Sequence, residues 1–208
     1  MPAPISVVIP TLNDSQHLPG AVATLMEGLE AGLLRELIVA DGGSTDDTVA
    51  IAEAAGAKWV TAGGGLGAQL HLGCAEARAA WLLVMYPATR LQPGWTRAVG
   101  QAVQDGPAPW YFQLQYDVAG LAPAWVAGWT NRRAAWFGLP CGEQGLLVPR
   151  SLYEAAGGYP AIPVMQDVAL VRALTKTPVA KAQASGPPRA LASVAGASSE
   201  AYRTPGWA

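Results

Sequence analysis

The sequence predicts a single-domain α/β fold in which a mostly parallel central sheet is flanked by helices. Continuous runs of aliphatic and β-branched residues at 5–10, 36–40 and 81–85 are typical of strands that are buried on both faces of a parallel sheet. Segments with helical periodicity separate these runs, and such alternation indicates βαβ units with right-handed crossovers. The length of 208 residues fits one domain with one core.

The first half of the chain predicts four strands and the helices between them. Residues 5–10 (ISVVIP) end in proline, and the helix after them carries Leu18, Val22 and Leu25 at helical spacing. The second strand ends at Asp41, and a Gly-Gly-Ser-Thr-Asp turn follows it. In chain order, the expected elements are a strand at 5–10, a helix at 16–34, a strand at 36–40, a turn at 42–46, a helix at 47–55, a strand at 58–61, a helix at 66–79 and a strand at 81–85.

The second half predicts fewer strands and an irregular end. Beyond Thr177 the chain is rich in Ala, Ser, Gly and Pro, so we expect one edge strand near Val179 and then a loosely ordered tail. The expected division is a domain over 1–178, with the edge strand and tail over 179–208. The preceding elements are a strand at 110–116, a helix at 123–137, a strand at 146–149, and helices at 149–156 and 166–175.

Composition excludes some classes of partner. Charged residues make up only 13% of the chain, the formal net charge is −2, and no cationic run suggests contact with nucleic acid. Neither an export signal nor a transmembrane segment is visible, so we expect a cytoplasmic protein. The low surface charge leaves open a homo-oligomer or attachment to the inner face of a membrane. Cys74 and Cys141 have no metal-ligand spacing and are expected to be buried or half-buried thiols.

Polar residues and glycines follow the first two strands. Ligands of open α/β sheets bind outside the carboxyl ends of the strands, so these segments are expected to border a crevice. Asp41 ends an apolar strand, and an acid there must face the crevice or be buried with a partner. The glycines of 63–67 precede a helix and suggest a phosphate cradle, with a flexible turn as the alternative. The candidate nucleotide-binding residues are Pro10, Thr11, Asn13, Asp41, Gly42, Gly43 and Gly65.

Two of these segments resemble the family-two glycosyltransferases. The matching motifs are SVVIPTLND at 6–14 and ELIVADGGSTDDT at 36–48. The resemblance implies a GT-A-like, nucleotide-sugar-binding fold. It also implies that Pro10, Thr11 and Asp41 surround the base and ribose of a nucleoside-diphosphate sugar, which would donate its sugar to a hydroxyl acceptor.

A later segment, residues 138–174, resembles the bacterial branch of that family associated with radical-SAM and selenium-domain genes. The branch carries a Gly-Asp-Gln turn and a Glu-Asp pair at the acceptor side. The corresponding acceptor-side candidates are Glu143, Gln144 and Gln166, and Asp167 is the candidate general base. A carboxylate there could take the proton of an acceptor hydroxyl, while the alternative is that Asp167 caps the following helix.

The sequence departs from the family at its metal site. Where the family has a short acidic motif, residues 86–91 read Tyr-Pro-Ala-Thr-Arg-Leu, and Ala88 offers no oxygen to a hard cation. No metal ligand and no certain cofactor are therefore predicted, and dependence on Mg²⁺ or Mn²⁺ is expected to be weak or absent. Arg90 and Arg132 are the candidates to face the diphosphate.

Three readings of function follow. The leading one is a glycosyltransferase of the hexosyltransferase class, whose aromatic residues at 110–136 suggest an apolar or lipid-linked acceptor. Because charge stabilisation of the leaving group carries much of such a reaction, the alternative is a catalytically inactive, glycosyltransferase-like binding or scaffolding protein. A nucleotidyltransferase is a weaker third reading, since the basic glycine-rich opening loop of that class is absent after Pro10.

Overall fold

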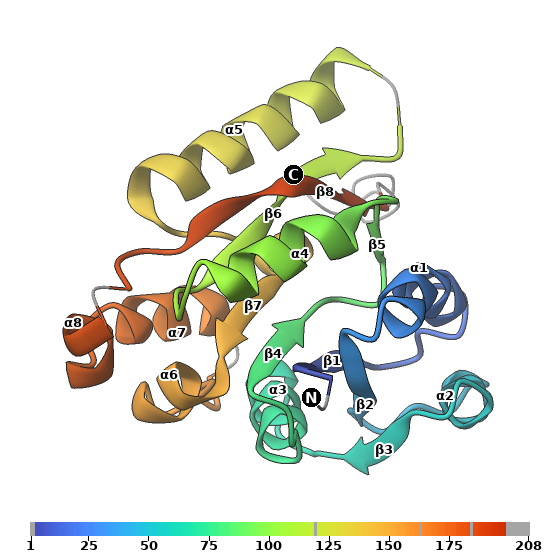
Figure 1. Cartoon of the computed structure of the whole chain (residues 1–208). Coiled ribbons are helices and arrows are strands. Elements are labelled where there is room, and N and C mark those ends of the chain that lie inside the picture. The colour runs from blue at the N-terminus through green and yellow to red at the C-terminus, as the bar shows by residue number, and fades with distance from the viewer. Residues whose placement is uncertain (1–2, 119, 163, 184, 199–208) are drawn as a thin grey trace.

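The computed structural model describes residues 3–118, 120–162, 164–183 and 185–198. Among these residues, one mixed sheet of eight strands carries helices on both faces (Figure 1). The strands are β1 (Ile5–Thr11), β2 (Leu34–Asp41), β3 (Lys58–Thr61), β4 (Trp81–Val84), β5 (Thr89–Leu91), β6 (Trp110–Tyr116), β7 (Leu146–Pro149) and β8 (Arg189–Ala197). The helices are α1 (Leu18–Glu30), α2 (Thr48–Ala54), α3 (Leu66–Ala75), α4 (Trp95–Gln104), α5 (Leu121–Phe137), η1 (Gly142–Gln144), α6 (Arg150–Ala155), α7 (Gln166–Leu174) and α8 (Pro178–Gln183).

The first half of the chain forms the parallel part of the sheet, as its apolar runs predict. β1 is buried along its whole length and pairs in parallel with β2 on one side and β4 on the other. β3 extends this part beyond β2, also in parallel. The register places Thr11 opposite Asp41, so the polar ends of β1 and β2 meet at one edge of the sheet.

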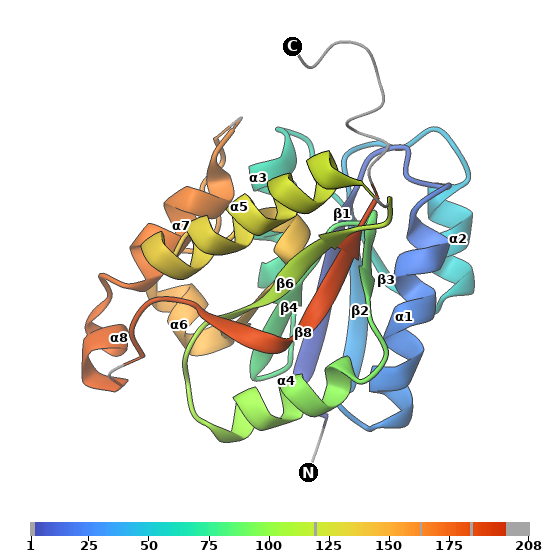
Figure 2. The same cartoon turned by 90° about the horizontal axis from the view of Figure 1, so that it is seen from above.

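The second half adds strands that run in both directions. The strand order is β3-β2-β1-β4-β7-β6-β8-β5. β7 pairs antiparallel with both β4 and β6, whereas β6 and β8 are parallel. The predicted single α/β domain with a mostly parallel, helix-flanked sheet is confirmed, and Figure 2 shows the helices on its two sides.

Two apolar layers hold the helices against the sheet. On one face, Leu18 and Leu25 of α1 and Trp95 of α4 join the inward side chains of β1 in one cluster. On the other face, a second cluster contains Leu70 of α3, Leu152 of α6 and Leu170 of α7. Alternate residues of β1 enter the two clusters, because successive side chains of a strand point to opposite faces. Both faces are therefore covered, which is why β1 and β4 consist mainly of apolar residues.

The end of the described chain corrects the sequence-based expectation. The edge strand predicted near Val179 is wrong, because Pro178–Gln183 form α8. The loosely ordered tail is also wrong for Arg189–Ala197, which form β8 between β6 and β5. The small residues of β8 indicate a loop by composition, but they fit a strand confined between two neighbours. The rest of the predicted tail, 199–208, lies outside the described residues.

Two elements near the middle of the chain were not predicted. α4 follows Gly94, and its buried residues Trp95, Val99 and Ala102 have the helical spacing that would have revealed it. β5 is only three residues long, and it forms because β8 lies beside it. Pairing between segments far apart in the sequence is not visible in either segment alone.

Candidate active site

The carboxyl ends of β1 and β2 are joined through the side chain of Asp41. One carboxylate oxygen accepts hydrogen bonds from the hydroxyls of Thr11, at 3.0 Å, and of Ser44. The other accepts the backbone N–H groups of Gly43, at 2.8 Å, and Ser44, at 2.7 Å. These four bonds fill the roughly four acceptor positions of a carboxylate, and only 1% of the Asp41 surface is exposed.

The same contacts set the charge of Asp41. Burial acts to raise the pKa of its carboxyl, but the hydrogen bonds from Ser44, Gly43 and Thr11 outweigh it and leave the pKa below 3.8. Asp41 is therefore ionised at neutral pH and holds the following loop in shape. Protein donors fill the acceptor positions of the carboxylate, so none is free for the predicted contact with a ribose. Contact with a ligand would be made by the loop itself.

The loops after β1 and β2 interlock at this edge. Asn13, with a φ of 56°, donates its backbone N–H to the Ser44 hydroxyl and accepts the Thr45 N–H on its side-chain oxygen, both at 2.8 Å. The predicted residues Pro10, Thr11, Asn13, Asp41, Gly42 and Gly43 thus come together. Asp46 accepts N–H groups of Ser15 and Thr48, which makes it a bridge between the loops and a cap for α2.

Helix α3 closes the third side of this edge. Its N-terminus lies at Gly65, which has a φ of 85°, and one turn later the buried Gln69 donates its amide to the carbonyl oxygen of Thr11 at 2.8 Å. A Cβ atom at Gly42 would lie 2.7 Å from the Gln69 side-chain nitrogen, so a larger residue there would displace this amide from its bond to Thr11. Sequence reasoning missed Gln69, although a polar residue among the apolar positions of a helix was a usable signal.

Asp167 lies on the first turn of α7, next to the segment that follows β4. Its carboxylate accepts the hydroxyl hydrogen of Tyr86 at 3.0 Å, and the Gln166 amide donates to the same hydroxyl oxygen at 3.4 Å. Burial raises the pKa of the Asp167 carboxyl, while hydrogen bonds from Tyr86, Tyr159 and Gly142 act in the opposite direction. The structure thus joins Asp167 and Gln166, and adds Tyr86, which sequence reasoning did not select.

The short helix η1 gives its two candidates different roles. Gln144 is fully buried, accepts the Cys141 N–H at 3.1 Å, and donates to the Phe112 carbonyl and to Asn131. It braces the strand beneath, and its contact with an acceptor stays a prediction. Glu143 accepts the Tyr116 hydroxyl at 3.1 Å, and burial raises the pKa of its carboxyl.

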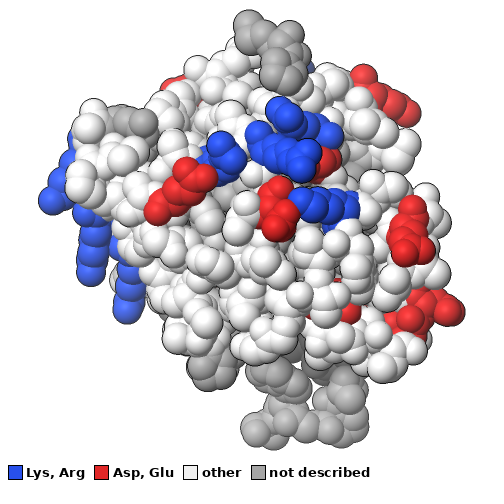
Figure 3. Space-filling view, turned by 90° about the horizontal axis from the view of Figure 1, so that it is seen from below, with Lys and Arg blue, Asp and Glu red and all other residues white. Residues whose placement is uncertain are grey.

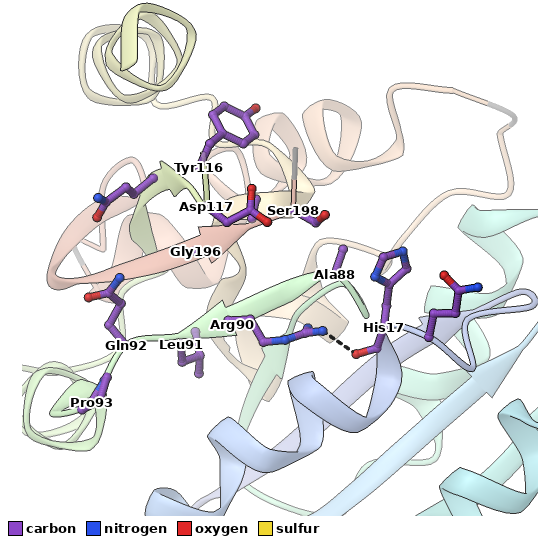
Figure 4. Close-up of a pocket in the computed structure, with 13 residues that line it drawn as sticks. His17, Ala88, Arg90, Leu91, Gln92, Pro93, Tyr116, Asp117, Gly196 and Ser198 are labelled. Carbon is purple, nitrogen blue, oxygen red and sulfur yellow. Dashed lines mark hydrogen bonds between the residues drawn. The ribbon is translucent and has the colours of Figure 1, made fainter. Parts of the chain in front are cut away.

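A cleft of about 700 Å³ opens beside Ala88 (Figure 4). Its walls come from the start of α1, from β5, and from the ends of β6 and β8. Arg90 lines it, and Figure 4 shows the guanidinium bonded to the His17 carbonyl oxygen, at 2.7 Å. Bonds to the carbonyls of Pro87 and Thr89 occupy further donors of Arg90. Arg132 is exposed on α5 and is not part of the cleft, so the structure separates the two predicted diphosphate-facing residues.

The side chains beside Ala88 do not suit a divalent cation. Tyr86 donates its hydroxyl to Asp167, and the acceptor positions of Asp41 are filled by protein donors. Among the residues that the structure describes, Asp117 is the one carboxylate that lines the cleft together with Ala88. Within the described part of the chain, no three His, Cys, Asp or Glu side chains group closely enough to hold a metal. A hard cation prefers several oxygen ligands, and the described side chains beside Ala88 do not supply them.

The mixed sheet, its helical cover and the interlocked loops at the ends of β1 and β2 define a GT-A-like glycosyltransferase fold. Residues 6–108, close to half of the chain, match the model of Glycosyl transferase family 2, so the chain contains a domain of that family. This domain includes the strand ends that carry Thr11 and Asp41.

A short segment of the chain is similar to a known enzyme, and solved structures share the fold. A glucosyl-3-phosphoglycerate synthase of Mycolicibacterium smegmatis is 49% identical over 57 residues, which are 27% of this chain and 18% of that protein. The Mycobacterium tuberculosis structure of such an enzyme with Mn²⁺, uridine diphosphate and glucosyl-3-phosphoglycerate has a TM-score of 0.61 at 20% identity, over 93% of this chain and 70% of that one. The structure of Staphylococcus aureus TarS residues 1–349 has a TM-score of 0.68 at 15% identity and covers 94% and 60% respectively. The chain thus spans well under the full length of these proteins.

Proposed function

We propose that this protein transfers a sugar from a uridine-diphosphate sugar to an acceptor hydroxyl, without requiring a divalent cation. The observation that carries the proposal is the family 2 domain, whose β1 and β2 end in the interlocked loops around Asp41. Uridine diphosphate is the nucleotide named for the related M. tuberculosis and TarS structures. Pro10, Thr11, Asn13, Gly42 and Gly43 would form the nucleotide pocket, with Asp41 holding their backbone in place.

Asp167 would act as the general base. The acceptor hydroxyl would lose its proton to the carboxylate as its oxygen bonds to the anomeric carbon, while the bond from that carbon to the nucleoside diphosphate breaks. Burial raises the pKa of Asp167, which makes the carboxylate a stronger base than an exposed one. Tyr86 would hold it in one orientation through the 3.0 Å hydrogen bond, and Glu143 and Gln166 would lie on the acceptor side.

The leaving diphosphate would be stabilised by donors of the chain itself. The glycines at 63–65 precede α3, and the free N–H groups of a helix N-terminus favour anions. Arg90 adds a cation at the cleft beside Ala88. These groups are weaker than a bridging cation, so a low turnover is expected.

A donor screen tests the proposal. The full chain is incubated with several uridine-diphosphate sugars, with EDTA or with Mn²⁺, and release of uridine diphosphate is measured. Hydrolysis or transfer that persists in EDTA, and falls at least about a hundredfold in Asp167→Asn, is the expected result. An Ala88→Asp variant is the matched comparison, because it restores a carboxylate at the family's metal position.

The same screen distinguishes this proposal from the second hypothesis, that the chain is a catalytically inactive binding protein. The alanine at position 88 favours that hypothesis. If only Ala88→Asp turns over a donor, and does so only with Mn²⁺, the natural chain has lost catalysis and the proposed metal-free transfer is wrong.

The segment at 138–174 further supports a place in the branch associated with radical-SAM and selenium-domain genes. Action in the cytoplasm is part of the same proposal.

A further inference from the structure

Helix α5 turns its large apolar side chains outward, whereas a helix at the surface of a globular domain usually buries them. The side chains that it buries against β6 are the alanines 127 and 134, while its large apolar side chains point to solvent. Its place is fixed by Asn131, which accepts the Leu114 N–H at 2.8 Å and donates to the Leu114 carbonyl oxygen at 3.0 Å. The outward residues are 51–92% exposed, and they are Leu121, Trp125, Trp129, Trp136 and Phe137.

Four of these residues form one continuous stripe, which we call the tryptophan stripe. At 100° per residue, Leu121, Trp125, Trp129 and Trp136 fall within about 80° of the helix circumference. Scattered exposed apolar residues are common, but a contiguous set of large side chains marks an interaction surface. α5 forms the outer layer at the top of Figure 1 and lies in front in Figure 2, so no other described element covers the stripe.

Charge identifies the kind of partner. Arg132 is exposed and falls within the angular range of the stripe, and residues 118–142 contain no Asp or Glu. The stripe is therefore apolar with positive charge, in a chain whose formal net charge is −2. On the opposite side of the molecule, Figure 3 shows charged side chains of both signs. The single sign on α5 is a property of that helix rather than of the whole surface.

We propose that the tryptophan stripe binds the surface of a membrane that contains anionic lipids. Tryptophan prefers the boundary between headgroups and acyl chains, where its ring is apolar and its N–H can still be hydrated. Arginine beside it is attracted to anionic headgroups. α5 would lie along the surface with the stripe immersed, and no described helix is long and apolar enough to cross the bilayer.

A second copy of the chain fits the stripe less well. Pairing two stripes would bury Arg132 of each copy in an apolar interface, and α5 offers no carboxylate to pair with it. An unpaired buried charge costs several kcal/mol. A membrane surface instead lets the guanidinium reach the headgroups while the neighbouring rings enter the apolar layer.

Vesicle flotation of the full chain tests the proposal. Vesicles of phosphatidylcholine with phosphatidylglycerol are expected to carry the protein at low salt, and phosphatidylcholine alone should carry much less. The double change Trp125→Ser and Trp129→Ser should weaken binding by at least about tenfold. Arg132→Gln should weaken it by about fivefold, and added salt should reduce this difference. Because no sugar donor is present, the result does not depend on the proposed transfer.

A matched double change on another helix is the control. Met26 and Leu29 on α1 are 47% and 57% exposed, so Met26→Ser with Leu29→Ser removes exposed apolar surface away from the stripe and should leave binding unchanged. Thermal unfolding verifies that each variant is folded, and Trp136→Ser replaces the double change if that variant fails to fold. Absence of binding to the anionic vesicles, or binding that survives the tryptophan changes, overturns the proposal. So does a dimer, seen by sedimentation, that the tryptophan changes dissociate.

Discussion

At the scale of single residues, Asp41 could be recognised in the sequence as a family position, but the direction of its side chain could not be predicted. The rule that an acid ending an apolar strand faces a crevice or has a partner left two outcomes open. The structure shows the second, since four protein donors surround the carboxylate. The partners Ser44 and Gly43 could be named from the sequence, but which way the side chain turns depends on the loop conformation.

Replacing Asp41 by Asn is therefore expected to destabilise the fold. The Asn oxygen can still accept the backbone N–H groups of Gly43 and Ser44, but the amide nitrogen then replaces the oxygen that accepts the Thr11 and Ser44 hydroxyls, and those buried donors lose their acceptor. A loss of about 2–3 kcal/mol in the free energy of unfolding follows. Chemical denaturation at pH 7 measures it. Asp47→Asn is the control, because Asp47 is exposed and makes no side-chain cap bond, and it should change stability by less than about 0.5 kcal/mol.

The effect of Asp41 depends on pH in a defined direction. Its pKa lies below 3.8 in the folded state, so the ionised carboxylate stabilises the protein fully above that ordinary value. The contribution is lost as the pH falls through the lower, folded-state pKa. The stability difference between the natural chain and Asp41→Asn should accordingly shrink below about pH 4. A difference that stays constant down to the acid transition would show that ionisation of Asp41 is not what stabilises the loop.

Tyr86 is expected to position Asp167 rather than to react. In Tyr86→Phe the carboxylate loses a hydrogen bond that lowers its pKa, so the acid limb of the activity profile should move to higher pH. We also expect kcat to fall by about tenfold with little change in KM for the donor, because a hydrogen bond to a charged group is lost. The readout is kcat against pH for both proteins. An unchanged acid limb with a uniform loss of activity would indicate a purely structural role.

At the scale of elements, the strands that the sequence predicted well are those whose signal is local. β1, β4 and residues 37–40 of β2 are mainly apolar because helices cover both faces of the sheet there. β8 has no such run, since its buried residues Leu191, Ala195 and Ala197 are mostly small and alternate with glycine and serine. Its strand conformation comes from pairing with β6 and β5, which were found only in three dimensions.

Because β8 is held on both sides, a charge on its buried face should be poorly tolerated. Ala195 is fully buried and pairs with Leu91 on one side and Leu114 on the other. Ala195→Asp places an unpaired carboxylate there, and we expect a loss of at least about 3 kcal/mol in stability. Ala192→Asp on the same strand is exposed and should cost far less. Equal midpoints of thermal unfolding for the two variants would contradict the described position of β8.

At the scale of the whole molecule, the parts of the candidate site are held by different halves of the chain. β1, β2 and α3 supply the nucleotide edge, all within the family 2 match, whereas Asp167 comes from α7 beyond it. Tyr86 connects the two, because it follows β4 and bonds to Asp167. The sequence predicted the first part through two motifs. It could not predict the link, since a tyrosine next to a missing acidic motif carries no signal of its own.

This arrangement makes a clear prediction for nucleotide binding. If uridine diphosphate binds the folded chain at the β1–β2 edge, it should stabilise the fold by about 2.7 kcal/mol at one hundred times its dissociation constant. The side chains beside Ala88 do not suit a divalent cation, so the shift in unfolding temperature should be the same in EDTA and in Mg²⁺. In Ala88→Asp the added carboxylate would repel the diphosphate without metal, so its shift should be smaller in EDTA and recover with Mg²⁺. A shift that requires Mg²⁺ in the natural chain would mean that other residues hold a cation, and the metal-free mechanism would then fail.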